Sequence, residues 1–238
     1  MIHERSFKIE NTDLDQCGNI KPASVLYFAQ EIAGSHAAQL GTGWDVLQEK
    51  GLFWAVIRTR AEIFGQPKGG VVVAKTWPMP ATRAAYPRCV MGYDEDGSLL
   101  FKVLSLWVLM DVKTRAMVLP GKSGIGVPGV QLGDEPPMPR ALPTKQTEPI
   151  QLRTVTTAQL DRNGHMNNTK YMDWVMEVSD FSTPVKGFEL CYLNEGRLGD
   201  VMELSTEQST DNLTVDIRRE KTDVPGEKER IFAASVWF

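Results

Sequence analysis

The chain has 238 residues, of which 42% are hydrophobic and 24% are charged, a composition typical of a soluble globular protein with one large core or two smaller ones. Its formal net charge of −4 argues against a general nucleic-acid binder, although a local basic patch for an acidic partner is compatible with that charge. The polar start of the chain lacks the apolar region of a signal peptide, and no apolar run approaches the about 18 residues of a membrane span, so we expect a cytoplasmic protein.

The first part of the chain is predicted to form one long helix and a run of antiparallel strands. Apolar residues recur at helical spacing over residues 22–40, and Gly41 follows as a helix stop. We interpret His36 as a packed side chain rather than a catalyst, because it falls on the apolar face of this helix with Val25, Ala29, Ile32 and Ala33. Alternating apolar residues predict strands at residues 5–14, 53–63, 71–77, 86–93 and 99–111, and a short helix at 44–50. Such an order is typical of an α+β unit whose sheet wraps the helix.

Residues 119–149 separate this unit from the rest of the chain. They contain seven prolines and little periodicity, which indicates an extended connection rather than a structural element. We therefore predict an N-terminal unit at residues 1–118, a linker at 119–149 and a C-terminal unit at 150–238.

The second unit is predicted to repeat the first. Its expected elements are a strand at residues 151–158, a helix at 168–180, and strands at 188–193, 201–209, 213–221 and 229–238. The sequence from Asp15 to Ile20 also aligns without gaps on the sequence from Asp161 to Met166, and Glu31 then falls on Glu177. The repeat predicts two similar folds, of which only the second carries an Asn and a His in the aligned loop.

That loop places an acid, an amide and an imidazole at alternate positions, as Asp161, Asn163 and His165. It ends at a helix start, where unpaired backbone N–H groups and the positive dipole end favour an oxygen that gains negative charge, such as that of a carbonyl under attack. Asn163-Gly164 is also a common turn dipeptide, and spacing alone leaves the tight-turn interpretation equally open.

The loop and the following helix resemble those of the acyl-acyl carrier protein thioesterases, double-hotdog enzymes of plants and bacteria that release fatty acids from acyl carrier protein. The resemblance covers nearly the whole chain, with weaker support from Trp54 to Arg58, Thr76-Trp77 and Ser105 to Trp107. It implies an α+β tandem (double) hotdog, two long helices each wrapped by an antiparallel sheet. Its sharpest part is Asp161-x-Asn163-x-His165-x-Asn167-Asn168-x-x-Tyr171-x-x-Trp174.

The resemblance also implies the catalytic residues: Asp161, Asn163, His165, and Glu195 on the following strand. It implies no metal and no cofactor, and an N-terminal unit that forms the acyl tunnel. Plant members often have Cys after the catalytic Glu, where this chain has Gly196. Water is then the expected nucleophile, because Cys191 would lie roughly 13 Å from Glu195 along a strand.

These residues favour a cytoplasmic thiolester hydrolase of lipid metabolism, an acyl-[acyl-carrier-protein] hydrolase that ends chain elongation in fatty acid biosynthesis. Glu195 beside His165 would activate water, a role suited to a carboxyl whose pKa burial raises toward neutrality, and Asp161 would orient the constellation. The alternatives are an acyl-CoA thioesterase on the same fold and a non-catalytic acyl-binding hotdog protein.

The expected partner is acyl carrier protein with its acyl-phosphopantetheine substrate, and neither a nucleic acid nor a membrane is expected to bind. Oligomeric state is not set by the sequence and is left open between a monomer and a homodimer. Acyl carrier protein is acidic like this chain, which argues against this partner unless a local basic patch compensates. The candidates for it are Arg58, Arg60, Lys68, Lys75, Arg83 and Arg88.

Overall fold

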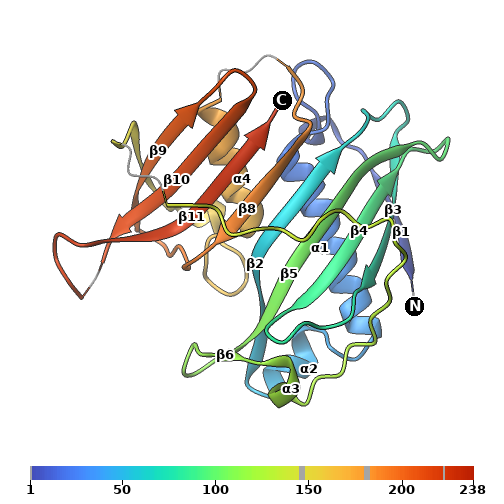
Figure 1. Ribbon diagram of the computed structural model, residues 1–238, viewed down its shortest axis with the longest axis horizontal. Helices are drawn as coiled ribbons and strands as arrows, with labels where there is room; N and C mark the ends of the chain where they lie inside the picture. The colour runs from blue at the N-terminus through green and yellow to red at the C-terminus, as the bar shows by residue number, and fades with distance from the viewer. Residues whose placement is uncertain (1, 145–147, 180–182, 222) are drawn as a thin grey trace. The chain divides into compact units, whose positions relative to one another are not determined.

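The computed structural model describes residues 2–144, 148–179, 183–221 and 223–238. The chain divides into two compact units, Met1–Pro139 and Arg140–Phe238, and each unit contains a helix on one face of an antiparallel sheet (Figure 1). No helix among the described residues is long and apolar enough to cross a membrane.

The first unit builds its sheet from strands in the order β1-β3-β4-β5-β2, all antiparallel, with β6 on β5. The strands are β1 (His3–Lys8), β2 (Leu52–Ile63), β3 (Val71–Pro78), β4 (Tyr86–Tyr93), β5 (Leu99–Asp111) and β6 (Met117–Val118). Helix α1 (Pro22–Gln39) lies across this sheet, and α2 (Trp44–Glu49) follows it (Figure 1). The predicted apolar face of α1 is buried, as expected.

The first strand is shorter than predicted. It ends at Lys8, and a 3-10 turn follows at Asn11–Asp13 instead of further strand. The Glu10 N–H donates to the Asp13 carboxylate at 2.9 Å, a local side-chain bond that competes with strand pairing. The strand predicted at 151–158 is wrong in the same way, because it ends at Thr154 and a 3-10 turn occupies Thr157–Gln159.

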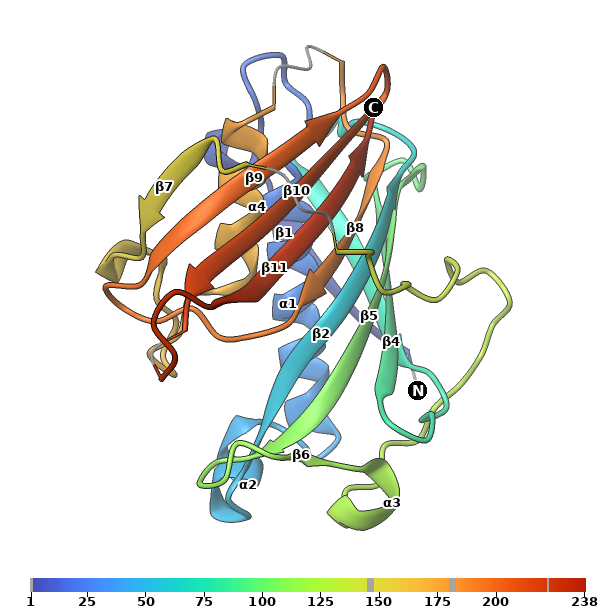
Figure 2. The same cartoon turned by 60° about the vertical axis from the view of Figure 1, so that its left-hand side comes forward.

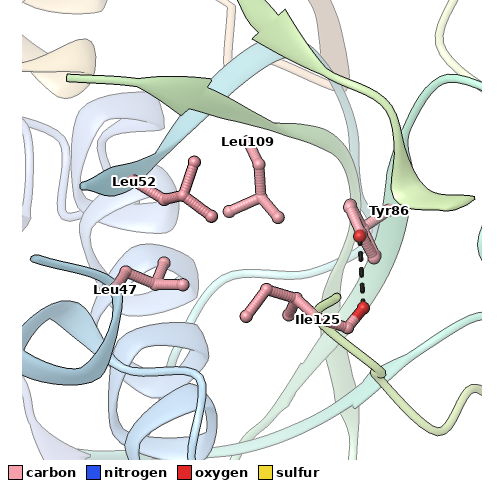
Figure 3. Close-up of a cluster of buried hydrophobic side chains, with 5 residues drawn as sticks. All are labelled: Leu47, Leu52, Tyr86, Leu109 and Ile125. Atoms are coloured by element: carbon pink, nitrogen blue, oxygen red, sulfur yellow. Dashed lines mark hydrogen bonds between the residues drawn. The ribbon is translucent and has the colours of Figure 1, made fainter. Parts of the chain in front are cut away.

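The proline-rich segment contains some regular structure. It contains a single helical turn, α3 (Pro120–Ser123), that the sequence did not predict. Ile125 then enters a buried cluster with Leu47, Leu52, Tyr86 and Leu109, and the Tyr86 hydroxyl donates to the Ile125 carbonyl at 3.3 Å (Figure 3). Burial of these side chains stabilises the segment against the first unit.

The second unit contains a sheet in the order β8-β11-β10-β9-β7, again antiparallel (Figure 2). Its strands are β7 (Gln151–Thr154), β8 (Gly187–Tyr192), β9 (Val201–Gln208), β10 (Asn212–Glu220) and β11 (Lys228–Trp237). Helix α4 (Asn168–Glu177) lies on one face of this sheet and is shorter than the predicted 168–180. Val178 caps its C-terminus, and residue 180 lies outside the described residues.

His36 is a packed histidine, as predicted. Its side chain is 1% exposed, and its Nδ1 accepts a hydrogen bond of 3.0 Å from Arg88 Nη1. Burial, together with the positive charges of Arg88 and His3, lowers the pKa of His36 to about 4. The imidazole is therefore neutral in the folded protein at neutral pH.

This histidine should make the protein less stable in mild acid. Between pH 6.5 and 4 the unfolded chain binds a proton on His36 that the folded chain does not, so stability falls as the pH drops through this window. We expect wild type to lose about 2 kcal/mol more unfolding free energy than His36→Asn between pH 7 and pH 5. Urea titrations at the two pH values measure this, and equal losses in both proteins would contradict it.

Candidate active site

The Asp161 loop is a tight turn closed by its own first residue. The Asp161 N–H donates to the His165 carbonyl at 2.8 Å, and the Gly164 N–H donates to the Asp161 carbonyl at 3.0 Å. Gly164 has φ of 77°, which favours glycine. The Asp161 carboxylate accepts the N–H groups of Asn163 at 2.8 Å and His165 at 3.3 Å, and the Asn163 side-chain amide at 3.4 Å. Asp161 thus holds the backbone that presents Asn163 and His165.

The first unit contains the same turn without side chains equivalent to Asn163 and His165. Asp15 accepts from the N–H groups of Cys17 at 2.8 Å and Asn19 at 2.9 Å, and the Gly18 N–H donates to the Asp15 carbonyl at 3.0 Å. Gly18 has φ of 80°. The predicted repeat is confirmed in the backbone bonds of this loop. The tight-turn interpretation is also correct, and what distinguishes the second copy is only which side chains the turn carries.

Helix α4 begins with Asn167 as its N-cap. The Asn167 side chain accepts from the Thr169 N–H and hydroxyl, both at 3.0 Å, and the Lys170 N–H donates to the Asn167 carbonyl at 2.9 Å. The Asn167 N–H donates to the Gln159 carbonyl at 2.8 Å. These three N–H groups have acceptors inside the protein. Among the described residues of the helix start, the Asn168 N–H is therefore the candidate donor for an oxyanion.

The structure brings His165 and Glu195 together. His165 Nε2 lies 3.3 Å from Glu195 Oε2, and their side chains are 20% and 33% exposed. Glu195 was expected on a strand, which is wrong: β8 ends at Tyr192, and Glu195 lies in the loop that follows. Arg197 Nη2 lies 3.6 Å from the same carboxylate oxygen. An imidazole, a carboxylate and a nearby guanidinium therefore lie together in one partly exposed place.

Gly196 has no room for a side chain. Its N–H donates to the Tyr171 hydroxyl at 3.1 Å, and its carbonyl accepts from the Met166 N–H at 2.8 Å. A Cβ on Gly196 would lie 2.6 Å from the Tyr171 hydroxyl oxygen and 2.7 Å from Met202 Cε. The position that carries Cys in the plant pattern is thus closed to a thiol in this backbone.

Gly196→Cys should therefore lower both stability and turnover. Overpacking typically costs about 1–3 kcal/mol, and relief of the contact would displace the adjacent Glu195. Gly34→Cys is the matched control, since a Cβ there meets nothing within 4 Å. Thermal unfolding and acyl-thioester turnover of both variants test this, and a Gly196→Cys protein as stable and active as wild type would contradict it.

Cys191 lies in the core of β8 and is 2% exposed. Its Sγ lies 3.4 Å from the Leu142 nitrogen and 3.5 Å from the Arg140 carbonyl oxygen. The backbone of the connecting segment thus contacts the thiol on its buried side.

Cys191→Ala should leave turnover within about twofold of wild type, because no step needs this thiol. It should lower the unfolding free energy by about 1 kcal/mol through the lost contacts. Steady-state turnover and urea unfolding of the same preparation measure the two effects. Loss of turnover in the folded variant would refute the assignment.

The prediction of a basic patch is wrong for Arg88. Arg88 is 9% exposed and donates to His36 and Thr76, so it cannot belong to a surface patch. Arg60 pairs with Glu62 at 2.8 Å, and Lys75 pairs with Glu4 at 3.3 Å.

Among the described residues no three His, Cys, Asp or Glu side chains gather in a way that could hold a metal ion.

Comparison with known families matches both parts of the chain. The profile of the acyl-ACP thioesterase N-terminal domain matches residues 1–119, and that of the acyl-ACP thioesterase C-terminal domain matches residues 143–236. The chain is 25% identical to a chloroplastic palmitoyl-acyl carrier protein thioesterase of Gossypium hirsutum over 74% of this chain and 47% of that protein. It is 26% identical to a chloroplastic dodecanoyl-[acyl-carrier-protein] hydrolase of Cinnamomum camphora, over 87% and 59% of the two chains. The chain thus spans about half the length of the curated relatives it matches.

Solved structures share the fold. An acyl-ACP thioesterase from Bacteroides thetaiotaomicron superposes with a TM-score of 0.87 at 21% identity, covering 100% of this chain and 97% of that chain. The 12:0-ACP thioesterase from Umbellularia californica superposes with a TM-score of 0.78 at 22% identity, covering 99% and 96%. The predicted α+β tandem hotdog is confirmed.

Proposed function

The chain belongs to the acyl-ACP thioesterase family, and on this premise we propose that it hydrolyses the thioester of fatty acyl groups carried on acyl carrier protein. The reaction would release free fatty acid and end chain elongation in the cytoplasm. One observation carries the proposal: the 3.3 Å approach of His165 Nε2 to Glu195 Oε2 in a partly exposed place that a substrate could reach.

Water is the nucleophile in this proposal. Glu195 accepts a proton from a bound water as the water oxygen bonds to the thioester carbonyl carbon. The tetrahedral oxyanion then collapses, the carbon–sulfur bond breaks, and the proton returns through His165 to the leaving thiolate of the carrier. The products are a fatty acid and the free thiol of the carrier's prosthetic arm.

The remaining residues position these groups. Asp161 keeps the turn in shape through its bonds to the Asn163 and His165 N–H groups. Asn163 contributes a side-chain donor to the substrate or the water, and the Asn168 N–H contributes a donor to the oxyanion. Donors fixed before the reaction stabilise developing charge without reorganisation.

The two halves divide the work. The C-terminal unit, residues 150–238, performs the chemistry, and the N-terminal unit, residues 1–118, holds the acyl chain in a tunnel. Supporting this division, the turn around Asp15 carries Cys17 and Asn19 at the places of Asn163 and His165. Residues 119–149 connect the halves.

Expression in bacteria tests the function. Wild type should raise the free fatty acids of the culture well above those of a culture that expresses His165→Ala at the same level. Equal fatty acid release from both cultures would contradict the proposal. Light scattering on the purified protein then distinguishes a monomer from the homodimer.

A further inference from the structure

The loop that carries Glu195 is held mainly by its backbone. The Glu195 carbonyl accepts from Arg219 Nη1 at 3.0 Å, and the Gly196 N–H donates to the Tyr171 hydroxyl at 3.1 Å. These two bonds act on both sides of one peptide bond. They fix the point from which the Glu195 side chain extends toward His165.

Arg219 is itself held by two carboxylates. It lies on β10, its side chain is 16% exposed, and Nη2 lies 2.7 Å from Glu229 Oε1. It also pairs with Asp200, whose carboxylate accepts the Arg197 N–H at 2.7 Å. Arg219 therefore binds the loop directly at the Glu195 carbonyl and indirectly, through Asp200, at the Arg197 N–H. A planar guanidinium with several fixed donors suits such a multiple contact, and a lysine ammonium does not reproduce it.

Tyr171 is equally constrained. It lies on α4, is 3% exposed, and stacks on Phe232 with ring centroids 4.8 Å apart and planes at 16°. Its ring also contacts Trp174 and Tyr192 edge to face. Packing on three sides fixes the hydroxyl that receives the Gly196 N–H.

We propose that Arg219 and Tyr171 are positioning residues that set the place of Glu195 relative to His165. The proposal rests on the proposed function, in which Glu195 is the base. Both residues act through the loop backbone, so they need no contact with the substrate. Misplacement of a reacting group by about 1 Å can cost about a hundredfold in rate, which makes backbone anchors effective determinants of turnover.

The test uses Arg219→Met and Tyr171→Phe, with Arg218→Met as the matched control. Arg218 neighbours Arg219 on β10, and its Nε lies 2.9 Å from Asp216 Oδ1, so the control also removes an ion pair of this strand. Tyr171→Phe keeps the ring stacking and removes only the acceptor of the Gly196 N–H. We expect kcat to fall at least about tenfold in both positioning variants, with KM within about twofold, and to stay within about twofold in the folded control.

Double variants with Glu195→Gln show whether the residues act through Glu195. If they do, Arg219→Met and Tyr171→Phe should lower kcat further by less than about twofold in the Glu195→Gln background. Arg219→Lys should recover only part of the loss of Arg219→Met. Full additivity of the losses would overturn the proposal. So would wild-type kcat in folded Arg219→Met and Tyr171→Phe, or an equal loss in the control.

The variants distinguish a failure of the positioning proposal from a failure of the proposed function. If Glu195→Gln is as active as wild type, the base assignment fails and the positioning proposal fails with it. If Glu195→Gln is inactive while folded Arg219→Met and Tyr171→Phe retain full kcat, only the positioning proposal fails. Near-ultraviolet circular dichroism on each variant verifies that the fold is intact.

Discussion

Glu195→Gln should lower kcat about a thousandfold while binding of the acyl substrate survives. The amide keeps the shape of the side chain and can still contact His165, but it cannot accept a proton from water. Single-turnover hydrolysis measures the chemical step, and calorimetric titration of a non-hydrolysable acyl substrate analogue measures binding. Glu207→Gln, at an exposed position of β9, is the control and should match wild type.

A thiol mechanism predicts the reverse pattern. In that mechanism Cys191→Ala is inactive, and an acyl group is trapped on Cys191. Mass spectrometry of quenched reactions would detect the added acyl mass on the peptide containing Cys191. Detection of this adduct at a rate matching turnover would overturn the water mechanism, although hydrolysis of the thioester would stand.

Asp161→Ala, Asn163→Ala and His165→Ala should each lower turnover by about a hundredfold or more in a folded protein. Asp161→Ala releases the two N–H groups that shape the turn, Asn163→Ala removes a side-chain donor, and His165→Ala removes the partner of Glu195. Steady-state hydrolysis at saturating substrate measures the effects.

Asp15→Asn is the control that the repeat provides. Asp15 makes the same turn bonds as Asp161, but its turn carries Cys17 and Asn19 instead of an amide and an imidazole at the matching places. The variant should leave the chemical step largely intact. A loss as large as that of Asp161→Asn, in a folded protein, would show that the chemistry is wrongly assigned to the C-terminal unit.

The sequence predicted most strand and helix positions because burial imposes a regular period. The residues of β4 and β5 alternate or run continuously apolar and end at turn residues, and both strands have the predicted bounds. Helix α4 ends three residues earlier than predicted, at Glu177. The errors at residues 9–14 and 155–158 come from side chains such as Asp13 that bond to the nearby backbone, which periodicity does not register.

The candidate site was only partly readable from the sequence. Asp161, Asn163 and His165 form a compact local pattern, and the repeat set them apart from Asp15 and its neighbours. Glu195 has no such local signal and was identified through the family resemblance alone. Arg88 does not belong among the candidates for a basic patch, because almost the whole of β4 is buried, whereas arginine side chains are mostly exposed.

Arg219 and Tyr171 were not predicted as part of the site. Arg219 reaches the loop from another strand, and its contact with the Glu195 carbonyl joins residues 24 positions apart. Tyr171 lies in the predicted helix and in the motif of the resemblance, neither of which indicates the hydrogen bond of its hydroxyl. Side chains that bond to a distant backbone leave no periodic trace in a sequence.

Hydrolysis of acyl carrier protein thioesters is tested by the rates of purified wild type on acyl carrier protein and coenzyme A thioesters with the same acyl chain. We expect stoichiometric release of fatty acid from acyl carrier protein, a kcat/KM on the coenzyme A thioester at least about tenfold lower, and loss of both activities in Glu195→Gln. Absence of release from acyl carrier protein by folded wild type, or a preference for the coenzyme A thioester, would contradict it.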